Sequence, residues 1–194
     1  MDLSRIGPVS GCLSSVTFTL SWMISALLYG KWELGSDSLS SLGICGVASA
    51  EIVFNFGCAM TGFFVIFLAL ALLEDRNRWF RYSGITAFVC AIACLGIGSV
   101  NEGYGDMHNF FAAVYGLFAA ATIALSGTGF YIEGKKYLTV LAAALLLISG
   151  ISSLIHPFGT FEPIGISSIL IWTFVMSAMV FVRNVREEVS PADH

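Results

Sequence analysis

The residue that points most directly to chemistry is an acid inside a largely apolar stretch. Glu51 lies within a run of mostly apolar residues from position 47 to 73. A carboxylate in the hydrocarbon of a bilayer costs about 2.5–3.5 kcal/mol near the helix centre and less toward the interface. Asn55 and Cys58 follow at helical spacing, so the three side chains share one face. Two interpretations are open: a hydrogen bond between helices that fixes packing, or a carboxylate that binds a ligand or handles protons.

Other ionisable side chains gather near the ends of predicted membrane spans. One histidine begins the fourth span, another ends the fifth, and acids flank the third, fourth and sixth spans. Under the topology derived below, all of them face the same side as Glu51, whereas His194 falls in the C-terminal tail on the other side. The sequence therefore predicts an acidic, His-containing vestibule on the outer face. Its members are Glu51, Asn55, Glu102, Asp106, His108, His156 and Glu162.

Such a vestibule could hold a divalent metal ion. Imidazole and carboxylate groups are zinc ligands, and an open coordination position would make a hydrolytic site. The spacing does not support a known pattern, because the sequence has no H-E-x-x-H motif and the two histidines fall on different helices. The cofactor is therefore unknown, and a metal, if present, is expected at His108, His156 and Asp106.

The composition defines the environment of these residues. The chain has 194 residues, of which 57% are hydrophobic and only 11% charged, and its mean hydropathy is +0.84. A soluble domain of this size cannot bury so much apolar side chain. Nine Lys and Arg and a net charge of -4 also provide no basic face for a nucleic acid. The composition therefore indicates a protein embedded in a membrane.

Six runs of the sequence are long and apolar enough to span a bilayer. A membrane helix needs about 20 mostly apolar residues, since each residue adds about 1.5 Å. The runs are approximately 8–29, 47–73, 82–100, 107–131, 138–155 and 164–182. The sequence thus predicts an all-α fold, a six-transmembrane-helix bundle that forms a single integral membrane domain over residues 1–194.

The distribution of basic residues predicts how the bundle is oriented. Lys and Arg accumulate in the cytoplasmic loops of membrane proteins. Eight of the nine Lys and Arg fall on one side of the predicted spans, and Lys31 alone falls on the other. We therefore expect a multi-pass protein of the cell membrane with both the N- and the C-terminus in the cytoplasm.

Two segments of the sequence carry a resemblance to a family. They are 39–43 (LSSLG) and 51–57 (EIVFNFG). A Ser-x-Leu-Gly loop that leads into a helix with an aromatic-Asn motif and a Gly resembles a prokaryotic six-helix integral membrane family of unknown function, distantly similar to the DRAM/Sfk-type membrane proteins. The resemblance implies a fold and a topology but no reaction. The matched positions are Ser41, Gly43, Asn55, Gly57 and His108.

Three functions are compatible with these patterns. In the first, the vestibule binds a lipid, a small solute or a partner protein. The expected partners are membrane lipids, a partner membrane protein or a second copy of the chain, and no nucleic acid. In the second, the chain is an intramembrane lipid hydrolase that uses the His and carboxylate groups, with or without a metal. In the third, a proton or small ion passes along Glu51. The sequence contains no recognised catalytic motif, so the question of enzymatic activity stays open.

Overall fold

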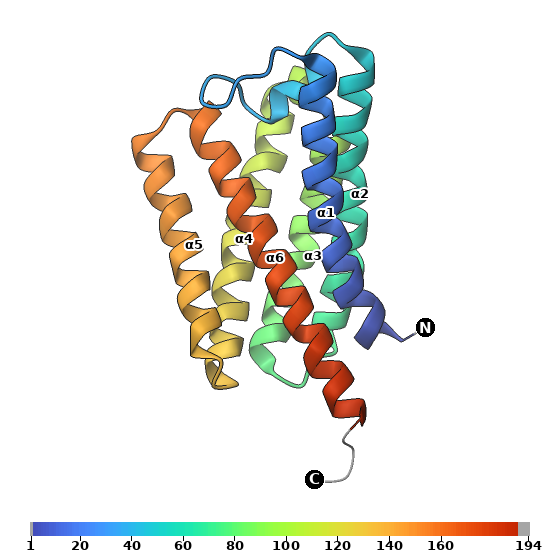
Figure 1. The fold of residues 1–194 in the computed structure, drawn as a ribbon, viewed down its shortest axis with the longest axis vertical. Coiled ribbons are helices and arrows are strands. Elements are labelled where there is room, and N and C mark those ends of the chain that lie inside the picture. Colours follow the sequence, from blue (N-terminus) through green and yellow to red (C-terminus); the bar gives the residue numbers. More distant parts are fainter. Residues whose placement is uncertain (1, 190–194) are drawn as a thin grey trace.

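The computed structural model describes residues 2–189, with side chains up to residue 187, so His194 lies outside the described residues. The described chain forms an all-α bundle of six long helices (Figure 1). In chain order the elements are α1 (Leu3–Tyr29), η1 (Ser40–Ile44), α2 (Ala48–Leu73), α3 (Arg78–Ser99), η2 (Glu102–Tyr104), α4 (Asp106–Ile132), α5 (Lys136–Ile155) and α6 (Phe158–Val189). All six long helices have the length and apolar character needed to cross a membrane, which confirms the predicted fold class.

The last helix differs most from the sequence prediction. α6 begins at Phe158 instead of 164 and continues to Val189, so Pro163 lies inside the helix. Pro163 is compatible with this position because its ring holds a helical φ and, this close to the helix start, its missing N–H removes only one hydrogen bond. The predicted start at 164 is therefore corrected to Phe158. The other helices begin and end within about five residues of the predicted boundaries.

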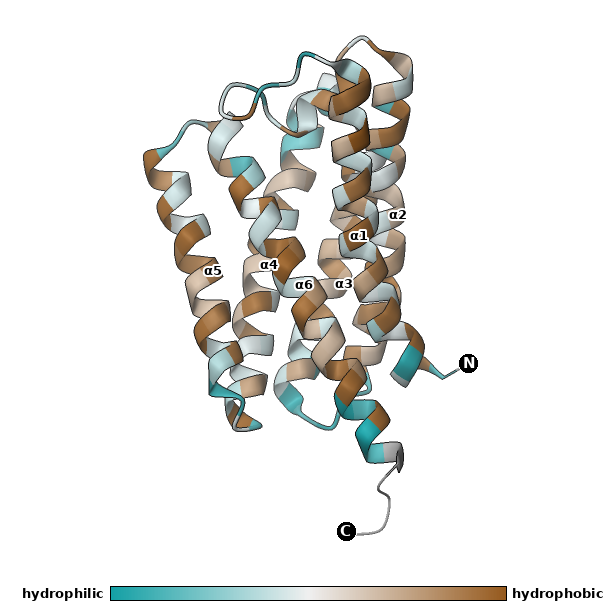
Figure 2. Ribbon diagram, in the orientation of Figure 1, coloured by the Kyte–Doolittle hydropathy of each residue, from teal (hydrophilic) through white to brown (hydrophobic). Residues whose placement is uncertain are grey.

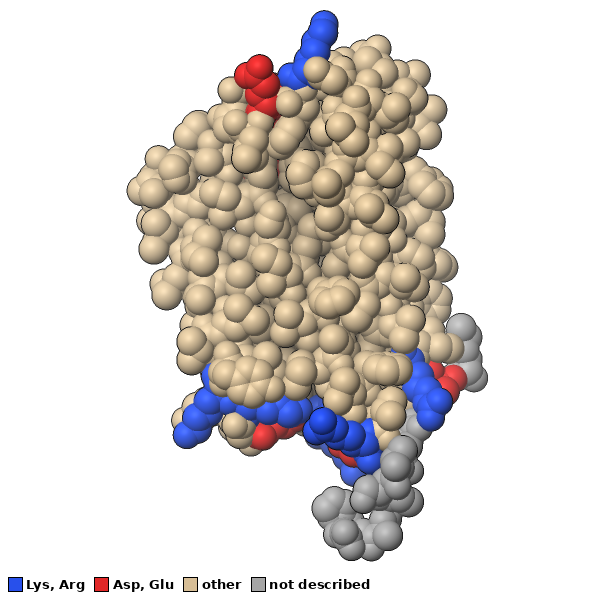
Figure 3. Space-filling view, viewed as in Figure 1, with Lys and Arg blue, Asp and Glu red and all other residues tan. Residues whose placement is uncertain are grey.

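The surface of the bundle has the apolar character that lipid requires. Large apolar side chains project from its sides, and Leu27 and Leu154 are 80% and 86% exposed. The helices are predominantly apolar along their length (Figure 2). Figure 3 shows Lys and Arg gathered at the end that carries both termini, with the middle of this face free of charged groups. An exposed apolar surface of this extent would be unfavourable in water, so the chain is a multi-pass membrane protein.

Glycines bring the backbones of α1, α2 and α3 into direct contact. A Cβ added at Gly98 of α3 would lie 2.6 Å from the carbonyl oxygen of Asn55 in α2, and a Cβ at Gly57 of α2 would collide with Ser21 of α1. In a bilayer, helices associate through van der Waals packing instead of the hydrophobic effect, and small residues at the interface allow the closest approach. These three helices form the tightly packed part of the bundle.

Two features of α1 attach it to α6. Gly11 faces Ser177 of α6 so closely that a Cβ would collide with the serine hydroxyl. One turn earlier in α1, Pro8 has no N–H to donate to the carbonyl oxygen of Ser4. The side-chain amide of Asn184 in α6 donates to that oxygen instead, at 2.7 Å. A proline in the first helix thus creates an attachment point for the last one.

α4 and α6 make few contacts with each other, and these centre on Trp172. The indole Nε1 of Trp172 donates to Ser126 Oγ of α4 at 2.9 Å. The Trp172 ring meets Phe130 edge-on with centroids 6.0 Å apart, and Phe80 of α3 adds a second edge contact to Phe130 at 4.9 Å. α6 crosses the bundle diagonally (Figure 1), so its contact with α4 is confined to a short stretch.

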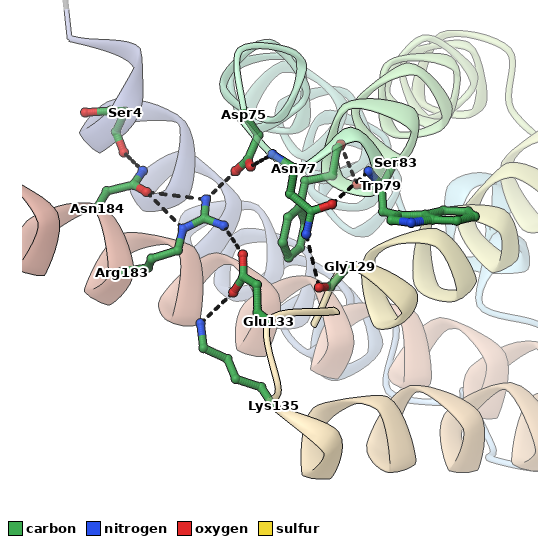
Figure 4. A network of polar contacts seen from close by, with 11 residues as sticks. Ser4, Asp75, Asn77, Trp79, Ser83, Gly129, Glu133, Lys135, Arg183 and Asn184 are labelled. Atoms are coloured by element: carbon green, nitrogen blue, oxygen red, sulfur yellow. Dashed lines mark hydrogen bonds and ion pairs between the residues drawn. The ribbon is translucent and has the colours of Figure 1, made fainter. Parts of the chain in front are cut away.

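A polar network joins three elements at the end that carries the termini (Figure 4). Arg183 of α6 forms ion pairs with Asp75, which follows α2, and with Glu133, which caps α4. Lys135 pairs with Glu133 at 2.8 Å, and the Arg183 guanidinium lies 5.1 Å from the centre of the Phe80 ring. The sequence shows these residues only as charges and predicts no contact between them. In the structure they hold the ends of α2, α4 and α6 together.

The glycine contacts predict a loss of stability in Gly98→Ala. The new methyl would meet backbone atoms of α2, which cannot move aside as a side chain can, and overpacking of this kind costs about 1–3 kcal/mol. Unfolding by SDS titration from mixed micelles measures the change. In the matched control Gly150→Ala, the methyl meets nothing within 4 Å, so we expect unchanged or slightly higher stability because alanine favours the helix. Equal effects of the two substitutions would contradict the close contact.

The polar network predicts a larger loss in Arg183→Gln. Removal of the cation leaves Asp75 and Glu133 close together without a counter-charge, and breaking a largely buried ion pair in this way costs about 3 kcal/mol. Arg186→Gln is the control, because Arg186 is exposed at the same end of α6. The same SDS titration applies. A loss no greater in Arg183→Gln than in the control would show that the network does not stabilise the bundle.

Candidate functional site

The bundle has a large cavity at each end. The cavity at the end with the termini has a volume of about 760 Å³ and is lined by charged groups that include Arg183, Asp75 and Glu133. Arg183 is already paired with both acids. The second cavity, in the opposite half of the bundle, measures about 460 Å³. We call it the α4–α6 cavity, because these two helices supply most of its lining.

The walls of the α4–α6 cavity are mainly apolar. They include Phe18, Phe54, Ile97, Phe161, Ile166 and Ile169. His108 and Gly116 both line the cavity and lie eight positions apart on α4, which corresponds to a length of about 12 Å along the helix. A further hollow of about 40 Å³ shares Tyr115 and Ile169 with it and continues toward Trp172. The dimensions and the lining fit a site for a small, largely apolar ligand.

The cavity is closed at the end of the bundle by the connection between α1 and α2. Leu39 and Ser40 of that connection line the cavity, and Leu39 is only 3% exposed. The carboxylate of Glu162 in α6 accepts a hydrogen bond from the Leu39 amide at 2.6 Å. It also interacts with Ser40, so it satisfies free amides at the start of η1. Glu162 therefore both holds the connection down and brings a carboxylate to the cavity.

His108 is the second ionisable side chain in the cavity. It is 4% exposed, and its Nδ1 lies 2.7 Å from the carbonyl oxygen of Val100 at the end of α3. A carbonyl oxygen can only accept, so Nδ1 must carry the hydrogen. In the neutral imidazole, Nε2 is then an acceptor. The arrangement leaves Nε2 as the one polar atom of His108 that a ligand can engage.

Two glycines leave open space in the cavity walls. A Cβ added at Gly116 of α4 or at Gly165 of α6 would meet nothing within 4 Å, although both residues line the cavity. Glycine inside a helix costs about 1 kcal/mol relative to alanine. At Gly98 that cost is offset because the glycine lets two helix backbones pack closely. At Gly116 and Gly165 no neighbouring helix fills the space that the missing side chain leaves. The glycines therefore widen the cavity.

The cavity opens sideways, between α4 and α6. Asn109, Ala113, Gly116 and Phe158 line it and are also exposed on the surface of the bundle. The end of the bundle is closed by the connection that Glu162 holds. The open side of the cavity is therefore the one between α4 and α6.

The structure brings two of the predicted vestibule residues, His108 and Glu162, into one cavity. Glu102, in η2, lies close enough to Glu162 to interact with it electrostatically. Asp106 is exposed at the first position of α4, and His156 is exposed at the end of α5. All seven lie in the half of the bundle opposite the termini, but most of them do not line the α4–α6 cavity.

Glu51 and Asn55 have partners in the connection before α2. Glu51 lies in the first turn of α2 and accepts from the amide of Gly46 at 2.6 Å. Asn55 Nδ2 donates to the carbonyl oxygen of Gly43 at 3.1 Å. A Cβ at Gly43 would lie 2.6 Å from Asn55 Oδ1, which explains physically why this glycine and asparagine occur together. Glu51 and Asn55 therefore both bind the backbone of the connection before α2.

The candidate metal ligands do not converge. Among the described residues, no group of three or more His, Cys, Asp or Glu side chains is placed to hold a metal ion. Asp106 and His108 lie in the first turn of α4 and His156 follows α5, and of the three only His108 lines the cavity. The set proposed from the sequence is therefore corrected to separate residues.

The cavity itself was not foreseen from the sequence. The available signals were Gly116 and Gly165, which occur in helices without a turn or a close helix contact to require them, and Asn109 beside His108. Cys58 and Cys94 also reach the cavity. Cys94 Sγ donates to the carbonyl oxygen of Cys58 at 3.2 Å, as expected for small packed side chains.

Comparison with known proteins identifies the family of the chain. Over residues 12–179 the chain matches the family described as protein of unknown function, DUF998. The matched region includes the α4–α6 cavity and the contact between Gly43 and Asn55. No curated protein and no solved structure matches the chain. The chain is thus a multi-pass membrane protein that belongs to the DUF998 family.

Proposed function

We propose that this protein binds a lipid-like amphiphile in the α4–α6 cavity. The observation that carries the proposal is an apolar cavity of about 460 Å³ that opens between two helices and has His108 and Glu162 at its closed end. An apolar tail can lie along the Phe and Ile side chains while a polar head reaches the two ionisable groups. Pockets that bind small molecules commonly combine apolar walls with a few placed polar groups.

The size of the cavity favours a ligand with one chain. A length of about 12 Å along α4 and a width limited by Phe54 and Phe161 accommodate a single acyl or isoprenoid chain. The sideways opening supports recruitment from the bilayer, where such molecules are concentrated. The other functions open from the sequence, a lipid hydrolase and an ion pathway along Glu51, have no comparable supporting observation in the described residues.

We further propose that the cavity lies in the outer half of the cell membrane and that both termini are cytoplasmic. The support is the concentration of Lys and Arg at the end that carries the termini (Figure 3), following the positive-inside rule. A prokaryotic origin and a distant similarity to DRAM/Sfk-type proteins are hypotheses that rest on the motif around Gly43 and Asn55.

Binding in the cavity is tested with Gly116→Leu. The leucine side chain would occupy the cavity without meeting protein atoms at its Cβ. A photoreactive diazirine analogue of dodecanol, crosslinked to the protein in phosphatidylcholine nanodiscs, should label α4 and α6 around the cavity in the wild type. In Gly116→Leu we expect about tenfold less labelling, because the leucine side chain takes up space that the probe needs. Overpacking the cavity with both groups costs about 1–3 kcal/mol.

Gly150→Leu is the matched control for this experiment. Gly150 is an exposed helical glycine with open space around it, but it does not line the α4–α6 cavity. Labelling around the cavity should therefore stay at the wild-type level. Wild-type labelling spread evenly over the lipid-facing surface, or unaffected by Gly116→Leu, would exclude the cavity as a binding site.

The orientation is tested with single-cysteine variants labelled from outside intact cells. The chain contains five cysteines, so they are first replaced by serine or alanine. Ser36→Cys, in the connection before α2, should react with a membrane-impermeant maleimide. Arg76→Cys, in the connection after α2, should react only after the membrane is permeabilised. The reverse pattern would show the opposite orientation.

A further inference from the structure

The polar end of the α4–α6 cavity is rich in hydrogen-bond acceptors. Glu162 contributes carboxylate oxygens. In its neutral form His108 contributes the acceptor Nε2, since its Nδ1–H is donated to the carbonyl oxygen of Val100. The Ser40 hydroxyl is engaged with Glu162. The remaining side-chain N–H and O–H donors that line the cavity are the Asn109 amide, next to His108, and the Tyr115 hydroxyl, seven residues after His108 on α4. A head group that donates hydrogen bonds fits this set, whereas one that only accepts leaves the acceptors unsatisfied.

The charge around the cavity leads to the same conclusion. Within residues 2–189, no Lys or Arg lines the cavity. A second acid, Glu102, interacts electrostatically with Glu162. In a cavity with apolar walls, electrostatic interactions are stronger than in water, so an anionic head would be repelled and a cationic one attracted.

We infer that the ligand is a single-chain amphiphile with a hydrogen-bond-donating head, a protonated amine or a hydroxyl, and that anionic lipids are excluded. This inference rests on the proposed function, since it names the ligand class of the same cavity. Glu162 acts as the acceptor for the head, and His108 Nε2 is the second acceptor. Charge-assisted hydrogen bonds are about twice as strong as neutral ones, so an amine should be preferred to an alcohol.

The inference is tested with three photoreactive probes that share one dodecyl chain and differ only in the head. The probes are diazirine analogues of dodecylamine, dodecanol and dodecanoate, used in phosphatidylcholine nanodiscs at equal membrane concentration. We expect the amine to label the cavity at least about tenfold more than the carboxylate, with the alcohol between them. Equal labelling by all three, or strongest labelling by dodecanoate, would overturn the assignment of the head group.

Glu162→Gln tests whether the preference for the amine comes from the charge of Glu162 or from the shape of the cavity. Glutamine keeps an oxygen that can accept from the Leu39 amide, so the connection over the cavity should stay in place. The amine should lose its advantage over the alcohol, while labelling by dodecanol should change less than about threefold. Glu33→Gln is the control, because Glu33 is an exposed acid before α2 that does not line the cavity. It should preserve the preference for the amine.

The outcomes distinguish this inference from the proposed function. If none of the three probes labels the cavity, the proposed function itself fails. If dodecanol labels the cavity but the head makes no difference, the cavity binds apolar chains and the head-group inference alone fails. Loss of amine preference in both Glu162→Gln and Glu33→Gln would attribute it to the general acidity of this end, and not to Glu162.

Discussion

The direct contact of α1, α2 and α3 is the constraint on which the rest of the bundle depends. It exists because Gly57 and Gly98 have no side chain to separate the helix backbones. In a bilayer, surrounding lipid is as apolar as the helix surfaces, so close packing and interhelical hydrogen bonds must supply the stability. This compact half provides the surface against which α6 is placed, through Gly11 and through the hydrogen bond of Asn184.

The cavity follows from the way α6 is held. At the end with the termini, Arg183 joins it to the connections after α2 and α4. At the other end, Glu162 joins it to the connection before α2. Between these points α6 crosses the bundle diagonally (Figure 1) and meets α4 around Trp172. On the side of Trp172 away from the termini, the space between the two helices is the α4–α6 cavity, which apolar side chains line.

His108 and Glu162 each use one polar atom to bind the protein backbone and keep another that a ligand can bind. His108 uses Nδ1 to satisfy the last carbonyl oxygen of α3 and retains Nε2. Glu162 satisfies the amide of Leu39 and retains lone pairs on its carboxylate. A buried polar group without any partner would be costly. Because each side chain already has one hydrogen-bond partner in the protein, both ionisable groups can be kept in an otherwise apolar cavity.

Several features could be predicted from the sequence because they depend on single side chains or on local spacing. The six spans follow from runs of apolar residues, and the acid in α2 was expected to need a partner. The packing of the helices could not be predicted in this way. Helical periodicity placed Glu51 and Asn55 on one face, but both are directed to the connection before α2 and not to the cavity.

The sequence by itself determined that the chain is a six-helix membrane bundle with its basic residues at the end that carries the termini. Only the tertiary structure decided that His108 and Glu162 share a cavity while His156 and Asp106 remain on the surface. The physical reason is that apolar length and charge are properties of each segment alone. Which side chains meet depends on the tilt and rotation of each helix, and these are set by contacts between residues far apart in the chain.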